Sequence, residues 1–182
     1  MTAPGQFWTR WRVRLSYPVA LAAYFLALPT PRSLAIGASI SLLGLLLRAW
    51  AAGHLQKHER LSTSGPYAFT RNPLYLGSLL IASGCLLAGR SWLAAALFIL
   101  YFLLFYPAVM RREEAELRAR YAAAFDEYAC RVPLFFPLPA GARARDTSFS
   151  WRLYRRNREH QAALGFLVGV ALLALRIYWQ WP

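Results

Sequence analysis

The residues best suited to chemistry lie in a short polar segment between two apolar stretches. The segment reads Gly65-Pro66-Tyr67 and then Arg71-Asn72-Pro73-Leu74-Tyr75-Leu76-Gly77. Pro73 suits the first turn of a helix, because the N–H group that proline lacks would have no partner there. Such a helix start presents free N–H groups and a partial positive charge, and Arg71 stands two residues before it. The segment therefore predicts a binding site for a carboxylate or a phosphate, with Tyr75 offering a ring and a hydroxyl and Gly77 allowing close approach to the backbone.

A second polar segment, residues 111–130, carries the adjacent carboxylates Glu113 and Glu114. Apolar residues recur in it at helical spacing, so we predict one amphipathic helix that continues the preceding apolar stretch. Glutamates four residues before an arginine are expected to pair with it along the helix, at about 0.3–0.5 kcal/mol each. The expected pairs are Glu114 with Arg118 and Glu116 with Arg120.

The elements that hold these segments are apolar and long. Of the 182 residues, 58% are hydrophobic and 16% are charged, against roughly 25% charged in an average soluble chain. This composition excludes intrinsic disorder and argues against a soluble globule. A bilayer core of about 30 Å needs roughly 20 helical residues. Five blocks approach that length, the first and third being short: Leu15–Leu28, Leu34–Ala52, Leu74–Ala88, Trp92–Met110 and Ala162–Trp179.

We therefore predict an all-α, polytopic membrane protein, with one integral membrane domain over residues 1–182. It has about five transmembrane helices and a cytoplasmic amphipathic helix. The net charge is +13, and with the N-terminus inside, 17 of the 21 Lys and Arg residues fall in cytoplasmic segments. This asymmetry is typical of membrane proteins. Segments 53–73 and 111–160 are predicted to form a site at the cytoplasmic face, of the inner membrane if the chain is bacterial.

Four weaker signals complete the pattern. Arg48 lies inside the second apolar block and is expected to snorkel to the interface, while the basic stretch 141–158 is expected to bind anionic lipid. His54 and His58 stand four residues apart without a third ligand nearby, so we predict no metal site. In the last block, the small-xxx-small pattern at 165 and 169 predicts helix packing.

In their order, these motifs resemble the signature of the isoprenylcysteine carboxyl methyltransferase family and of its phospholipid methyltransferase relatives. That signature has Gly-Pro-Tyr, then Arg-His-Pro-x-Tyr-x-Gly, a hydrophobic stretch and Glu-Glu. Here Asn72 stands where many members carry histidine. The sequence Phe125-Asp126-Glu127-Tyr128 and the following Arg131-Val132-Pro133 are similar to the end of the family's pattern. The resemblance covers roughly residues 50–137.

The resemblance implies an enzyme that uses S-adenosylmethionine. Arg71 and the helix start would take the carboxylate of this cofactor. Glu113 or Glu114 would take its ammonium or ribose, and tyrosines would face its adenine or its sulfonium. The implied catalytic residues are Arg71, Asn72, Glu113 and Glu114. The implied cofactor-binding residues are Glu59, Arg60, Leu61, Ser62, Gly65, Tyr67, Arg71, Asn72, Pro73, Tyr75, Gly77, Glu113 and Glu114.

Each of these residues also has a simpler interpretation. Arg71 is a common flank of a membrane span, and Tyr67 and Tyr75 could belong to an interfacial aromatic belt. Asn72 could cap the helix that follows it. The two glutamates could form a solvated helix face.

The acceptor of the methyl group is expected to be a lipophilic molecule or lipid that enters from the bilayer. No strong general base accompanies the motif, so a carboxylate or thiolate, already anionic at pH 7, is favoured over an ammonium that must first lose a proton. The alternatives are a phospholipid N-methyltransferase, a sterol-type membrane reductase that uses NADPH, and a non-catalytic membrane scaffold. Membrane lipids are expected partners, nucleic acid is not, and the oligomeric state stays open.

Overall fold

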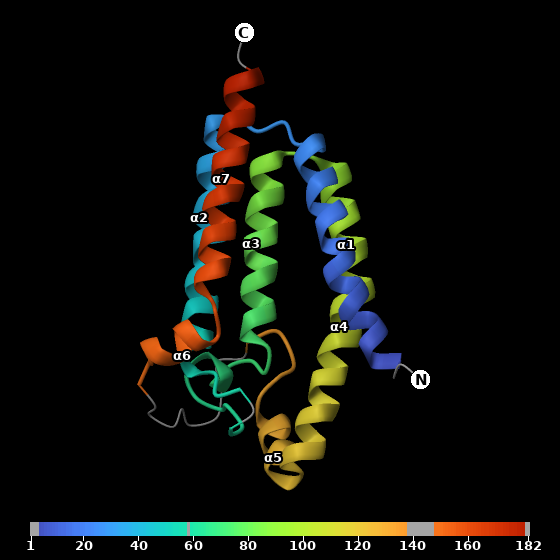
Figure 1. The fold of residues 1–182 in the computed structure, drawn as a ribbon, viewed down its shortest axis with the longest axis vertical. Coiled ribbons are helices and arrows are strands. Elements are labelled where there is room, and N and C mark those ends of the chain that lie inside the picture. Colours follow the sequence, from blue (N-terminus) through green and yellow to red (C-terminus); the bar gives the residue numbers. More distant parts are fainter. Residues whose placement is uncertain (1–3, 58, 138–147, 181–182) are drawn as a thin grey trace.

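The structure, a computed structural model, describes residues 4–57, 59–137 and 148–180. These residues contain helices and no strand, which confirms the predicted all-α class within the described ranges. Figure 1 shows the long helices running side by side, with the short elements gathered at one end. The long helices are α1 (Pro4–Leu26), α2 (Pro31–His54), α3 (Pro73–Gly89), α4 (Trp92–Tyr121) and α7 (His160–Gln180). The short elements are the 3-10 helix η1 (Gly65–Ala68), α5 (Ala123–Arg131) and α6 (Trp151–Arg156).

Each apolar block of the sequence corresponds to one long helix, although the first block extends two residues beyond the end of α1. By length and hydropathy, three helices could cross a membrane, namely Pro31–His54, Trp92–Tyr121 and His160–Trp179, and the chain is accordingly a membrane protein. α3 is apolar but has 17 residues, about 26 Å at 1.5 Å per residue. α1 begins before its apolar block and includes three arginines. Crossing of the bilayer by all five helices therefore remains a prediction.

Glycines allow α2 and α3 to pack closely along their length. A Cβ atom built on Gly84 would lie 2.3 Å from the carbonyl oxygen of Gly37, and one on Gly77 would lie 2.8 Å from that of Gly44. Only glycine permits backbones to approach this closely, as in other membrane helix pairs. Among the described residues, nothing lies within 4 Å of a Cβ built at position 165 or 169, so the packing role predicted for these two glycines remains a prediction.

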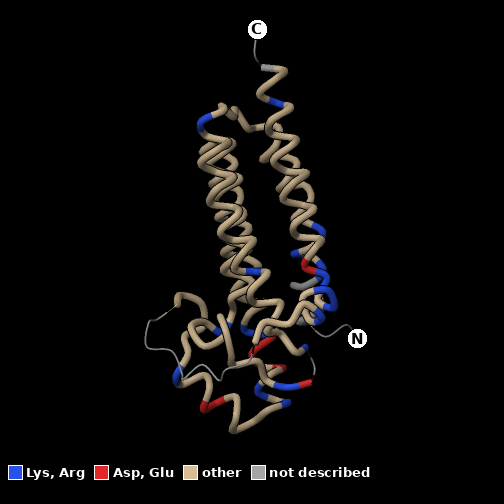
Figure 2. The backbone as a smooth tube through the Cα atoms, turned by 90° about the vertical axis from the view of Figure 1, so that its left-hand side faces the viewer, with Lys and Arg blue, Asp and Glu red and all other residues tan. Residues whose placement is uncertain are grey.

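Charge gathers at one end of the bundle. Figure 2 shows most Lys, Arg, Asp and Glu residues at the end that carries the N-terminus, with a few basic residues at the opposite end. One of the latter, Arg176 of α7, closes the end of α1. Its Nε and Nη2 donate to the carbonyl oxygens of Ala27 and Phe25 over 2.6 and 2.7 Å. The described parts of segments 53–73 and 111–160 lie at the charged end (Figure 1).

The amphipathic segment 111–130 is not one helix, and the prediction of a continuous helix is wrong. α4 ends at Tyr121, and Ala122 has φ 43° and ψ −121°, outside the helical region. The bend turns α5 back beneath the polar loop, so that Phe125 and Tyr128 become buried. Arg118 bridges the bend with an ion pair to Asp126 over 2.7 Å. Burial of the aromatic face offsets the strain at Ala122, which costs of order 1–3 kcal/mol.

The segment that begins at residue 148 packs against the end of α2. The backbone N–H of Ser150 donates to the carbonyl oxygen of Gly53 over 3.1 Å. The side-chain amide of Asn157 donates to the carbonyl oxygens of Ala52 and Leu55 over 2.9 and 3.0 Å. These bonds satisfy carbonyls that a helix end leaves without partners. Part of the basic stretch 141–158 lies outside the described residues, and its lipid contact remains a prediction.

Candidate active site

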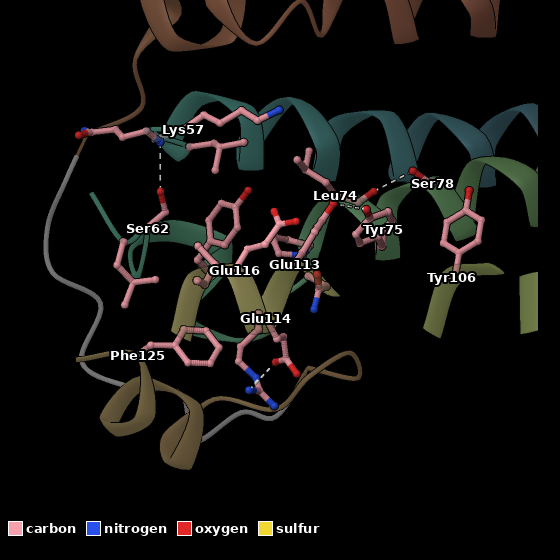
Figure 3. Close-up of a pocket in the computed structure, with 18 of the residues that line it drawn as sticks. Lys57, Ser62, Leu74, Tyr75, Ser78, Tyr106, Glu113, Glu114, Glu116 and Phe125 are labelled. Carbon is pink, nitrogen blue, oxygen red and sulfur yellow. Dashed lines mark hydrogen bonds and ion pairs between the residues drawn. The ribbon is translucent and has the colours of Figure 1, made fainter. Parts of the chain in front are cut away.

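A cavity of about 760 Å³ lies at the charged end of the bundle, within the range of about 300–1,000 Å³ typical of small-molecule sites. Its walls come from α1, the end of α2, the loop 55–62, η1, the start of α3, and α4 with α5. Figure 3 shows Lys57, Ser62 and Phe125 at one end of it and Ser78 and Tyr106 at the other. Ten of the predicted site residues line it: Arg60, Leu61, Ser62, Tyr67, Arg71, Asn72, Pro73, Tyr75, Glu113 and Glu114.

The start of α3 is fixed by the extended chain that follows α5. Three consecutive residues of the motif bind three consecutive carbonyls of that chain. The Thr70 hydroxyl donates to Phe135 over 2.8 Å, the Arg71 N–H to Pro133 over 2.9 Å, and the Asn72 side-chain amide to Leu134 over 2.9 Å. Asn72 stands at the N-cap position but makes no side-chain capping bond. Its side chain therefore holds the loop instead of capping α3.

Arg71 and Glu114 meet inside the cavity. Nη1 of Arg71 lies 2.5 Å from Oε1 of Glu114, and the side chains are 16% and 20% exposed. Nε of Arg71 and Oε1 of Glu114 are buried and make no well-aligned hydrogen bond within the described chain. The pair expected between Glu114 and Arg118 is thus replaced by one between separate segments. The pairing expected for Glu116 also differs, because its carboxylate lies 2.7 Å from Nε of Arg112.

The other glutamate of the motif, Glu113, binds a tyrosine. The Tyr75 hydroxyl donates to Oε1 of Glu113 over 2.7 Å and accepts a hydrogen bond from Nη1 of Arg12 over 3.1 Å. Figure 3 shows Tyr75 and Glu113 close together in the cavity. The ring of Tyr75 meets that of Tyr106 edge to face at 5.5 Å. This network joins α1, α3 and α4 around the middle of the cavity.

Two buried tyrosines, Tyr67 of the Gly-Pro-Tyr turn and Tyr128 of α5, contact each other at the cavity wall. The Tyr128 hydroxyl donates to the carbonyl oxygen of Tyr67 over 2.7 Å. Burial, together with the nearby Tyr128 and Glu113, raises the pKa of Tyr67, and burial likewise raises the pKa of Tyr128. Both hydroxyls therefore stay protonated at neutral pH and do not act as bases.

Comparison with known families identifies the family of the chain. A family model described as phospholipid methyltransferase matches residues 33–124, half of the chain. The chain belongs to the phospholipid methyltransferase family. The match includes Arg71, Tyr75, Glu113 and Glu114. Helices α1, α6 and α7 lie outside it, as does α5 after its first two residues.

Two curated relatives are similar to parts of the chain. The cobalt-zinc-cadmium resistance protein CzcN of Cupriavidus metallidurans is 39% identical over 104 residues, 56% of this chain and 46% of that protein. The nickel-cobalt-cadmium resistance protein NccN of Alcaligenes xylosoxydans xylosoxydans is 36% identical over 115 residues, 60% of this chain and 54% of that protein. The chain thus spans about half the length of the curated relatives it matches. No solved structure matches it.

Three residues that the resemblance implied for the phospholipid methyltransferase site lie outside the cavity lining. Glu59 pairs with Arg156 of α6. Gly65 has φ +57°, and a Cβ on it would lie 2.7 Å from the ring of His54. Gly77 is approached by the helix α2. Close packing of protein accounts for both glycines here, and a ligand role for the three remains a prediction.

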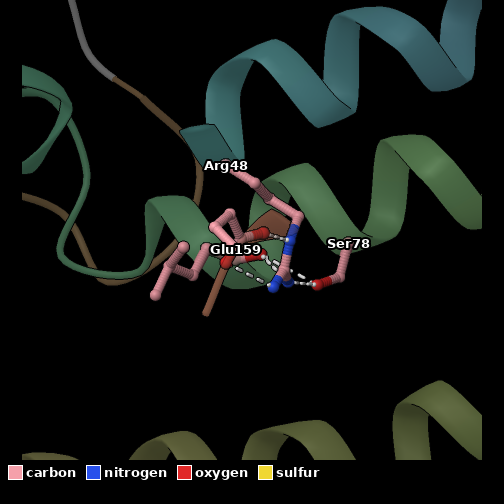
Figure 4. Close-up of polar contacts among 4 residues, drawn as sticks. Arg48, Ser78 and Glu159 are labelled. Atoms are coloured by element: carbon pink, nitrogen blue, oxygen red, sulfur yellow. Dashed lines mark hydrogen bonds and ion pairs between the residues drawn. The ribbon is translucent and has the colours of Figure 1, made fainter. Parts of the chain in front are cut away.

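The structure also adds residues that the motifs did not indicate. Arg12, Arg48, Ser78, Tyr101 and Tyr106 line the same cavity. Arg48 is expected to snorkel to the interface, which remains a prediction. It reaches Glu159 at the start of α7 (Figure 4), with Nε to Oε1 at 2.5 Å and Nη2 to Oε2 at 3.1 Å, and Ser78 of α3 at 2.5 Å. A charge inside an apolar block is a signal for function, but its partner 111 residues away could not be read from the sequence.

The histidines do not form a cluster in the part of the chain that the structure describes. Nδ1 of His54 lies 2.9 Å from the carbonyl oxygen of Trp50, and His58 lies outside the described residues. Among the described residues, no group of three potential metal ligands occurs.

Proposed function

We propose that the chain transfers a methyl group from S-adenosylmethionine to a lipophilic acceptor at the cytoplasmic membrane face. The observation that best supports this proposal is the ion pair of Arg71 and Glu114 inside the cavity, beside the start of α3. A ligand with an amino-acid end presents a carboxylate and an ammonium side by side. Arg71 complements the first charge and Glu114 the second.

The remaining groups of the cofactor have partners of the right chemistry in the cavity. Phe125 and Tyr67 offer rings for adenine, and Glu113 offers a carboxylate for the ribose hydroxyls. Tyr75 offers an aromatic face for the sulfonium. When bound, the cofactor supplies a methyl group that its sulfonium already activates. The protein then has mainly to hold donor and acceptor in line, which can lower the barrier by about 7–11 kcal/mol.

The acceptor is a lipophilic molecule that presents a carboxylate or a thiolate. The cavity extends from the loops to α1 and to the membrane part of α4, where Tyr101 and Tyr106 line it. Because Tyr67 and Tyr128 stay protonated, they provide no base for an ammonium group. A phospholipid amine, as the family description suggests, is the second candidate.

Titration calorimetry with S-adenosylhomocysteine tests the proposal. We expect the protein in phosphatidylcholine nanodiscs to bind one equivalent, and to bind NADPH far more weakly. Binding of NADPH alone would favour a reductase of the sterol type. Binding of neither ligand by a folded sample would favour a non-catalytic scaffold. Tritiated methyl transfer into a membrane extract then separates acceptors, because esters release methanol in base and methylated phospholipid amines do not.

The charge distribution supports the proposed cytoplasmic location of the site, which has its own test. Trp92 begins α4 at the sparsely charged end and is 90% exposed. Cys130, in α5 at the charged end, is exposed. With Cys85→Ala as background, we expect native Cys130 to react with a membrane-impermeant maleimide only from the cytoplasm. In Cys85→Ala/Cys130→Ser/Trp92→Cys, we expect labelling only from outside. The reverse pattern would invert the topology.

The names of the two relatives suggest a setting for this activity. Both are named for resistance to divalent metals. Thiolates and carboxylates are ligands of such metals, and methylation turns either anion into a neutral thioether or ester that binds them more weakly. We propose that the acceptor belongs to this class of metal-binding, membrane-soluble anions.

A further inference from the structure

One basic side chain of the cavity, Arg12, has no part in holding the cofactor. Arg10, Arg12 and Arg14 follow one another at intervals of two in α1. Residues two apart in a helix point about 200° apart, so Arg12 faces opposite to the other two. Arg12 lines the cavity, whereas Arg14 lies over the ring of Trp11 at 5.8 Å and Arg10 is exposed.

Arg12 is held between aromatic rings. Its guanidinium carbon lies 5.6 Å from the ring centre of Tyr75 and 5.8 Å from that of Tyr106. A guanidinium over rings keeps the N–H groups at its edge available for planar anions. Its backbone carbonyl accepts a hydrogen bond from Tyr101 over 2.8 Å, which fixes α1 independently of the Arg12 side chain.

Arg12 differs from the other paired arginines of the cavity. Arg71 is neutralised by Glu114, and Arg48 by Glu159. Within the described residues, Arg12 contacts the Tyr75 hydroxyl and the rings of Tyr75 and Tyr106, and no carboxylate there lies within ion-pair distance of it. A guanidinium in a partly buried cavity without a counter-ion favours an anionic ligand.

We propose that Arg12 binds the anionic head of the methyl acceptor and so selects carboxylates or thiolates over ammonium groups. This inference rests on the proposed function. Arg12 lies with Tyr75 and Tyr106, at the α1 and α4 side of the cavity, away from the loop that carries Ser62 (Figure 3 shows Tyr106 and Ser62 at opposite ends). In the step, an acceptor oxygen or sulfur forms a bond to the methyl carbon. The bond from carbon to the sulfonium breaks, and its electron pair stays on that sulfur.

The test uses three probes with one tail: dodecanoate, dodecanol and dodecylamine. Their binding to protein in phosphatidylcholine nanodiscs is measured by calorimetry at pH 8.5, with and without S-adenosylhomocysteine, and corrected with empty nanodiscs. We expect the wild type to bind dodecanoate at least about tenfold more tightly than dodecylamine. Arg12→Gln should weaken dodecanoate binding about 10- to 100-fold, the usual range for a charged hydrogen-bonded contact. Arg12→Lys should retain the preference in part, and Arg14→Gln should leave it unchanged.

The outcomes separate this inference from the proposed function. If Arg12→Gln keeps the wild-type preference, or if Arg14→Gln loses it equally, Arg12 does not select the acceptor. Equal binding of the three probes by the wild type would also overturn the inference. S-adenosylhomocysteine binding, measured on the same samples, reports on the proposed function alone and should be the same in wild type and Arg12→Gln.

Discussion

Replacing Glu114 with glutamine is expected to weaken binding of S-adenosylhomocysteine by at least about 30-fold. The exchange keeps the volume of the side chain but removes the carboxylate that faces Arg71 at 2.5 Å. Removing one partner of a buried charge pair at a binding site typically costs 2–5 kcal/mol or more. Glu113→Gln should also weaken binding, because the amide can still accept from the Tyr75 hydroxyl but lacks the negative charge proposed to bind the ribose hydroxyls. Titration calorimetry of the purified variants measures both effects.

Glu116→Gln is the matched control for these variants. It belongs to the same helix and also lines the cavity, but its side chain is 61% exposed and its partner Arg112 is 34% exposed. Exposed pairs contribute about 0–1 kcal/mol, so binding should change less than about fivefold. Equal losses in all three variants would mean that the glutamates act only as a charged helix face.

Replacing Glu159 with alanine is expected to destabilise the protein by about 3 kcal/mol. Glu159 is 5% exposed in its side chain and makes two contacts with Arg48, which lies inside α2. Breaking a buried pair leaves an uncompensated charge and costs about 3–5 kcal/mol; the lower end applies because Arg48 is 23% exposed. Thermal unfolding in detergent, followed by circular dichroism, measures the loss.

Two further variants define the cause of that loss. Glu127 pairs with Arg131 on the surface of α5, with side chains 71% and 54% exposed. Glu127→Ala should therefore lower the free energy of unfolding by no more than about 0.5 kcal/mol. The double variant Arg48→Met/Glu159→Met removes both charges and should recover most of the stability. A double variant as unstable as Glu159→Ala would attribute the loss to packing rather than to charge.

The amino-acid sequence by itself determined that the five apolar blocks form helices and which end of the bundle is polar. Hydropathy is a property of each segment, and a segment in lipid must satisfy its own backbone hydrogen bonds, so the five apolar blocks had to be helices. The motif also carried the principal residues of the candidate site. Arg71, Tyr75, Glu113 and Glu114 were indicated by their order alone, and the structure brings them to one cavity.

Only the tertiary structure decided which side chains meet. Glu114 pairs with Arg71 rather than with Arg118, because the bend at Ala122 and the docking of residues 133–135 bring α3 and α4 together. Arg12 and Arg48 enter the cavity because of how their helices are rotated and packed. Their partners lie 63 and 111 residues away in the chain. Such contacts depend on helix rotation and on close glycine packing, which no local pattern of residues specifies.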